Sequence, residues 1–116
     1  MTRDDMTDRE LLELAAKAAG MEYIKPAEGY DGCLGLEVGN NPMRTQSWNP
    51  LKNDGDALRL AVKLKMCLKR HYFEGEYYVM ASHDAGWSQE NIKSDPYAAT
   101  RRAIVRAAAE IGRNDK

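Results

Sequence analysis

The thiol and imidazole groups of this chain could in principle form a metal site: Cys33, Cys67, His71 and His83. A structural zinc site normally takes ligands from close pairs such as C-x₂-C, because such a pair places two ligands on one turn. The sequence has no pair of this kind, and Cys67 and His71 would lie two pleats apart on a strand. We therefore expect reduced, unbridged thiols and two ordinary imidazoles, with no metal and no cofactor.

Nucleophilic catalysis would need a cysteine or serine beside a histidine that a carboxylate orients. The nearest fragment is His83-Asp84, but adjacent loop residues rarely face each other, and no glycine-flanked nucleophile accompanies them. The chain also lacks the G-x-x-x-x-G-K phosphate loop and the Rossmann glycine pattern. We expect no catalytic residue, and a small hydrolase that uses His71 or His83 is kept as a second alternative function.

Five residues could together bind an anionic ligand that carries a base: Arg101, Arg102, Arg106, Trp48 and Trp87. Arg101 and Arg102 lie near the start of a predicted helix, where free amides favour negative charge, and Arg102 and Arg106 share a face. Guanidinium groups suit phosphate oxygens, and a loop tryptophan can either stack on a base or cover the core. In the structural alternative, the arginines flank an alanine-rich stripe and pair with Glu110 or with the acidic first helix.

Composition and charge set limits on the fold and on the partners. The chain has 116 residues, of which 43% are hydrophobic and 30% charged, so we expect one domain over 1–116 with flexible tails at 1–6 and 113–116. A formal net charge of -1 argues against a nucleic-acid coat, and we expect no nucleic-acid partner. The first residues lack an apolar signal segment, and no apolar run is long enough to cross a bilayer. We therefore expect a cytoplasmic protein without membrane contact.

Three helices must position these residues, over about 8–19, 55–64 and 96–111. Thr7 and Glu10 have the spacing of a capping box, and Gly20 ends the first helix. Three polar residues compete as the N-cap of the second helix: Asn53, Asp54 and Asp56. In the second helix, Leu58 and Val62 lie beside the stripe that we expect to be buried.

The last helix carries the clearest pattern in the chain. Asp95 is a good N-cap, Pro96 suits the first helical position, and Gly112 is predicted to end the helix in a left-handed conformation. Apolar residues at helical spacing predict a buried stripe: Tyr97, Ile104, Ala107, Ala108 and Ile111. The alanines would let this helix lie close to the elements that it covers.

A β-hairpin is predicted over about 66–82, with Glu74-Gly75 as a two-residue turn. The aromatic residues on both sides of the turn favour a sheet, because aromatic rings pack well on a pleated surface. A helix that continues through Cys67 and Arg70 is the competing interpretation.

Alternating apolar residues predict a strand over 33–38, and a second short strand could return over 43–48. Residues 83–93 are polar and predict a loop, whereas the apolar run at 77–81 suggests a strand covered on both faces. These elements predict an α+β fold in which a small, mostly antiparallel sheet packs with three helices as a layered sandwich. Whether the helices cover one face of the sheet or both is left open.

Two segments also carry a resemblance to a known family: Trp-Asn-Pro-Leu at 48–51 and Asp-Pro-Tyr-Ala-Ala-Thr-Arg-Arg at 95–102. They resemble the NinX-like, or phage ABA sandwich, family of small proteins from tailed bacteriophages and prophages. The resemblance covers most of 8–112 and is weakest in 21–47 and 83–94. It implies a layered α/β domain and an accessory phage protein made in a bacterial host, but it implies no reaction.

These observations lead us to expect a non-enzymatic phage or prophage accessory protein that binds a host protein. The alternative is a nucleotide-like small molecule, held by arginines and aromatic rings as a counter-defence protein would sequester a signal. A deep pocket lined by such residues would favour the small ligand, and an exposed apolar patch would favour a protein partner. The oligomeric state is left open, and a homo-oligomer is compatible with the sequence.

Overall fold

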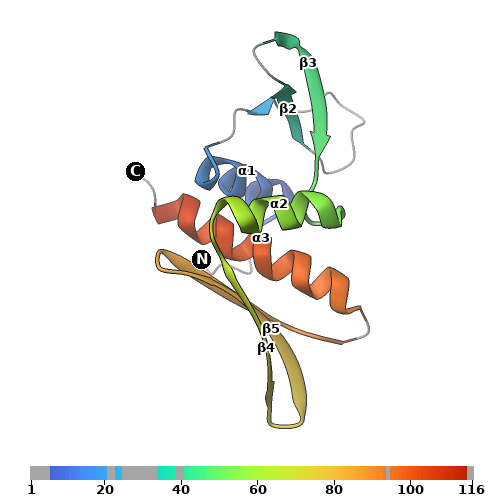
Figure 1. The fold of residues 1–116 in the computed structure, drawn as a ribbon, viewed down its shortest axis with the longest axis vertical. Coiled ribbons are helices and arrows are strands. Elements are labelled where there is room, and N and C mark those ends of the chain that lie inside the picture. The colour runs from blue at the N-terminus through green and yellow to red at the C-terminus, as the bar shows by residue number, and fades with distance from the viewer. Residues whose placement is uncertain (1–5, 21–22, 25–33, 39–40, 94, 115–116) are drawn as a thin grey trace.

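The computed structural model describes residues 6–20, 23–24, 34–38, 41–93 and 95–114, and Figure 1 shows their arrangement. In chain order the elements are α1 (Asp8–Ala18), β1 (Tyr23–Ile24), β2 (Leu34–Val38), β3 (Asn41–Trp48), α2 (Asp54–Lys63), β4 (Cys67–Phe73), β5 (Glu76–His83), β6 (Gly86–Asn91) and α3 (Pro96–Asn114). The strands form two three-stranded antiparallel sheets, in the orders β1-β2-β3 and β4-β5-β6. The predicted α+β class, with three helices and a small antiparallel sheet packed together, is confirmed.

Helix α3 is the central layer of the molecule. It contacts α1 and α2 as well as strands β5 and β6, and Figure 1 shows it between the other helices and the β4-β5 hairpin. Most side chains of the core come from the helices, and Trp48 of β3 joins them; the helical members include Leu11, Leu12, Leu60, Ile104 and Val105. Met6, which was predicted to belong to a flexible tail, packs against this core. The rest of that tail, the end of the C-terminal tail and Cys33 lie outside the described residues.

Gly112 lies inside α3 and does not end it, so the predicted left-handed stop is wrong. The helix continues to Asn114, and among the described glycines those with positive φ are Gly20 and Gly75. A side chain at Gly112 would overlap the backbone carbonyl of Leu14, because α1 and α3 cross at this point. Gly112 is therefore needed for the close approach of two helices.

Only one face of the sheet β4-β5-β6 is covered by a helix in the described part of the chain. Val79 and Ala81 of β5 are buried on the side of α3, whereas Tyr78 and Met80 on the opposite side are half-buried. The expectation that 77–81 is covered on both faces is therefore wrong. The reason is the order of the layers, because α1 and α2 pack on α3 and not on the sheet.

The predicted helix starts are confirmed by their hydrogen bonds. The Glu10 amide donates to Thr7 Oγ1 at 3.2 Å, and the Thr7 amide donates to Glu10 Oε1 at 3.0 Å. Asn53 is the N-cap of α2, since its Oδ1 accepts from the Asp56 amide at 2.8 Å. At α3, Asp95 Oδ1 accepts from two amides of the first turn. These caps satisfy donors that an α-helix leaves free.

The hairpin is confirmed, and the competing helix through Cys67 is wrong. Strands β4 and β5 pair in register from Cys67 opposite Ser82 to Phe73 opposite Glu76. Glu74 has φ 49° and Gly75 has φ 84°, as a two-residue primed turn requires. The turn therefore fixes the register of the hairpin.

Strand β6 lies in the segment that was predicted as a polar loop, so that prediction is wrong. The face of β6 toward α3 carries Gly86, Ser88 and Glu90 in place of apolar side chains. A Cβ at Gly86 would come within 3.1 Å of the Ala107 carbonyl oxygen, so this strand needs a small residue under the helix. The strand predicted over 43–48 is present as β3 and begins at Asn41.

Candidate functional site

Three arginines of α3, Arg101, Arg102 and Arg106, pair with carboxylates of other elements. Arg101 Nη1 lies 2.6 Å from Asp54 Oδ1, and Arg101 Nε donates to the Leu51 carbonyl at 2.9 Å. The side chain of Arg101 is 17% exposed, while that of Asp54 faces solvent. Arg101 therefore joins α3 to the start of α2.

The other two arginines converge on strand β6. Arg106 Nη1 donates to Glu90 Oε2 at 2.7 Å, and both side chains are mostly buried. Arg102 lies 3.9 Å from the second oxygen of Glu90 and 3.4 Å from Asp8 of α1. In the structural alternative, these arginines were expected to pair with Glu110 or with the acidic first helix. The pair of Arg102 with Asp8 of α1 agrees with it, and Glu110 pairs with Arg113. The three guanidinium groups thus bridge layers of the fold.

The two tryptophans do not join the arginines in one pocket. Trp48 is 3% exposed and belongs to the core, so a ligand could not stack on it without displacing core side chains. Trp87 is 52% exposed and pairs with Ser82, on the sheet face opposite the buried Ala81. That face points away from α3. The sequence-based ligand set is therefore divided among the core, the far face of the sheet and inter-layer ion pairs.

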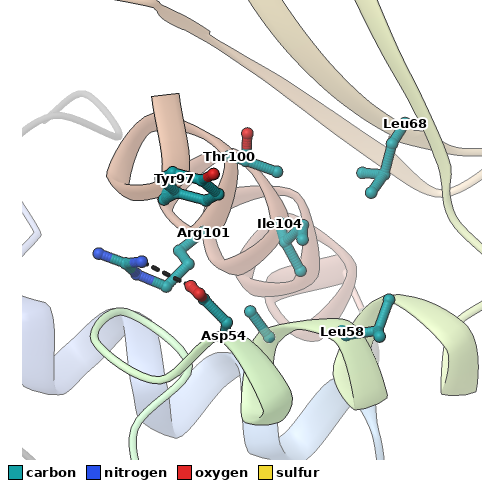
Figure 2. A pocket seen from close by; sticks show the side chains of 8 residues that line it. Asp54, Leu58, Leu68, Tyr97, Thr100, Arg101 and Ile104 are labelled. Atoms are coloured by element: carbon teal, nitrogen blue, oxygen red, sulfur yellow. Dashed lines mark hydrogen bonds and ion pairs between the residues drawn. The ribbon is translucent and has the colours of Figure 1, made fainter. Parts of the chain in front are cut away.

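An apolar groove lies between α2, α3 and β4, and sequence reasoning did not find it. Its volume is about 310 Å³, and Figure 2 shows the side chains around it. It is lined by Asp54, Ala57, Leu58, Leu68, Tyr97, Thr100, Arg101 and Ile104. The charged residues in this lining, Asp54 and Arg101, pair with each other (Figure 2).

The groove exposes large side chains that would normally be inside a protein. Leu58 is 59% exposed and Tyr97 is 69% exposed, and Leu68 is also exposed. Val62, one helical turn beyond Leu58 on α2, is exposed as well. Tyr97 was predicted to lie in the buried stripe of α3, and this is wrong, because among the described residues no element covers its side chain on the first turn of α3. Apolar periodicity indicates which residues could be buried. It does not distinguish the residues that are buried in the fold from those that remain exposed.

A second pocket, of about 400 Å³, gathers groups that the sequence considered for catalysis. It is lined by Lys65, Cys67, Ser82, His83 and Asp84. The Ala85 amide donates to His83 Nδ1 at 3.0 Å, which places the proton of a neutral imidazole on Nε2. The remaining nitrogen is then a donor and cannot take a proton from Cys67 or Ser82. Among the described residues, no three carboxylate, histidine or cysteine side chains are placed to hold a metal ion.

No protein-family model, curated protein or solved structure matches this chain. In the part of the chain that the structure describes, no helix is both long and apolar enough to span a membrane.

Proposed function

We propose that this chain is a non-enzymatic accessory protein of the phage type that binds a protein of the bacterial host, and that the groove between α2, α3 and β4 receives an apolar segment of that partner. The observation that carries the proposal is the exposure of Leu58, Leu68 and Tyr97 around one groove. An apolar surface of this kind is costly in water, and it commonly marks a protein interaction site. The phage setting rests on the resemblance at 48–51 and 95–102.

The same geometry gives less support to a nucleotide-like ligand. A phosphate would have to compete with Asp54, Asp8 and Glu90 for the guanidinium groups of α3. The groove itself has a mainly hydrocarbon lining, and its one arginine already has a carboxylate partner. Hydrophobic side chains of a protein match this lining better than a phosphorylated sugar does.

Site-specific photo-crosslinking in bacterial cells tests the proposal. A photoreactive phenylalanine analogue at position Leu58 is expected to give a covalent adduct with a discrete host protein. The same analogue at Lys17, on α1, is the control. Leu68→Asp in the Leu58-substituted chain should remove the adduct, because a carboxylate would be desolvated against the apolar partner.

Two outcomes would contradict the proposal. One is the absence of any adduct from Leu58, and the other is an equal set of adducts from Lys17. A thermal shift with mono-, di- or cyclic nucleotides that disappears in Arg101→Ala/Arg102→Ala would instead support the small-ligand alternative.

A further inference from the structure

Strand β4 is an edge of its sheet, because the strand order is β4-β5-β6. The Ile92 amide donates to the Tyr77 carbonyl at 2.8 Å, so Tyr77 directs its backbone groups toward the β6 side. Tyr72, the β4 partner of Tyr77, is therefore in a non-hydrogen-bonded pair and directs its own N–H and C=O to the free edge. Because hydrogen-bonded and non-hydrogen-bonded pairs alternate along an antiparallel ladder, Leu68 and Arg70 also direct their backbone N–H and C=O groups to the free edge.

The free edge is accessible along the hairpin, which extends beyond the helices in Figure 1. Among the described residues, Leu68, Arg70 and Tyr72 have no backbone hydrogen bond across this edge. Such a row of unused donors and acceptors is a template for an added strand.

The side chains of the same three residues lie on the sheet face toward α3. Leu68 lines the apolar groove, and it is paired with the buried Ala81. Farther along, the Arg70 guanidinium lies 4.3 Å from the centre of the Tyr77 ring. The centres of the Tyr72 and Tyr77 rings are 4.9 Å apart. A strand added to β4 would thus place alternate side chains beside the groove and beside Arg70.

The chain segment that leads into β4 and forms it carries charge of one sign, whereas Asp54 lies in the groove lining and Glu74 and Glu76 lie at the tip of the hairpin. Residues 57–73 contain five lysines and arginines and no aspartate or glutamate, although the whole chain has a formal net charge of -1. The cations are Arg59, Lys63, Lys65, Lys69 and Arg70. Arg59 pairs with Asp56, whereas Lys69 and Arg70 lie in β4 itself.

The same charge argues against a second copy as the occupant. An antiparallel pair of two β4 strands centred on Arg70 would place two arginines directly opposite, with Cβ atoms about 4.5–5.5 Å apart, and like charges in this position are destabilising. A strand that carries acidic residues opposite Lys69 and Arg70 would instead be attracted.

We infer that β4 is a docking edge for an extended, acidic polypeptide segment, which adds to the sheet as a further strand and places an apolar side chain in the groove beside Leu68. This inference rests on the proposed function, since it specifies how the partner segment would occupy the same groove. Strand addition supplies main-chain hydrogen bonds, and the groove and the cations select the side chains.

A displayed library of short random peptides, selected on the full-length chain, provides the probe. We expect enriched peptides in which acidic residues alternate or cluster beside apolar and β-branched residues. In the best peptide, N-methylation should abolish binding at alternate positions, because only every second amide of a strand faces β4. The intervening positions should tolerate the methyl group.

The matched charge variants are Arg70→Glu in β4 and Lys17→Glu on α1. Arg70→Glu should weaken peptide binding by about tenfold or more, and Lys17→Glu should leave it nearly unchanged. Circular dichroism of both variants checks that the fold is retained.

Several outcomes overturn the inference. These are the absence of enriched peptides, peptides without acidic residues, and loss of binding without a period of two on N-methylation. Binding of single-stranded oligothymidine that competes with the peptide would assign the edge to nucleic acid. If these tests fail while the Leu58 crosslink persists, strand addition is wrong and the proposed groove function stands. If the crosslink is also absent, both are wrong.

Discussion

Gly112→Ala tests the central helix crossing, because two effects of the substitution have opposite signs. In an exposed helix interior, alanine stabilises relative to glycine by about 0.8–1.0 kcal/mol. At Gly112, however, the new Cβ would overlap the Leu14 carbonyl, which belongs to the backbone of α1 and cannot rotate away. Overpacking in a core costs about 1–3 kcal/mol, and here the whole contact between α1 and α3 must shift. We therefore expect a net loss of about 2 kcal/mol in the free energy of unfolding.

Urea denaturation followed by circular dichroism measures this change. Gly55→Ala is the matched control, since Gly55 also lies in a helix but its new Cβ would meet side-chain atoms and no backbone, at 3.2 Å from both Arg59 Nη1 and Asn53 Oδ1. We expect the control to change the free energy of unfolding by no more than about 1 kcal/mol. A Gly112→Ala chain that is as stable as the wild type, or more stable, would refute the close crossing of α1 and α3.

Three further predictions concern the turn, an ion pair and a cap. Gly75→Val should lower the free energy of unfolding by more than about 1 kcal/mol in a denaturant titration, because a β-branched residue is strained at φ 84°; an unchanged midpoint would contradict the primed turn. Arg106→Ala should cost about 2 kcal/mol or more by the same assay, since it leaves the mostly buried Glu90 without its closest cation; full stability would show that the pair is dispensable. The Thr7 amide and hydroxyl hold the pKa of Glu10 below its ordinary value of 4.5, so the stability advantage of the wild type over Glu10→Gln should be present at neutral pH and disappear as pH falls through the lowered pKa; an advantage that grows in acid would have the wrong sign.

Local signals in the sequence predicted the elements whose stability is local. The Thr7 and Glu10 capping box, the Asp95 cap and the Glu74-Gly75 turn each depend on residues a few positions apart, and each is present in the structure. Strand β6 was missed because its covered face uses small and ion-paired residues under α3, so it has no apolar alternation. The sequence pattern of β6 alone cannot reveal a buried face when the burial comes from α3, which is distant in the sequence.

Gly112 shows the same limit in another form. A glycine near the end of a helical pattern fits a left-handed cap and also fits a close helix crossing, and the sequence around it is the same in both cases. The difference lies in Leu14, at the other end of the chain, whose carbonyl occupies the space of a side chain.

The candidate site was the hardest part to predict, because its residues belong to common helix and strand patterns that carry no sign of a binding site. Tyr97 was predicted in the buried stripe of α3, Leu58 was placed beside the stripe of α2, and Leu68 belongs to a strand, so nothing in the sequence marks the three as one exposed surface. They are exposed because the helices stack through α3, which leaves the corner between α2, α3 and β4 without a covering element in the described part of the chain. The arginines show the opposite case. In the sequence Arg101 and Arg106 could bind an anionic ligand, but in the structure they form ion pairs with Asp54 and Glu90. An apolar corner beside a cationic strand edge, with the helix arginines already neutralised, favours recognition of a polypeptide over recognition of a free phosphate.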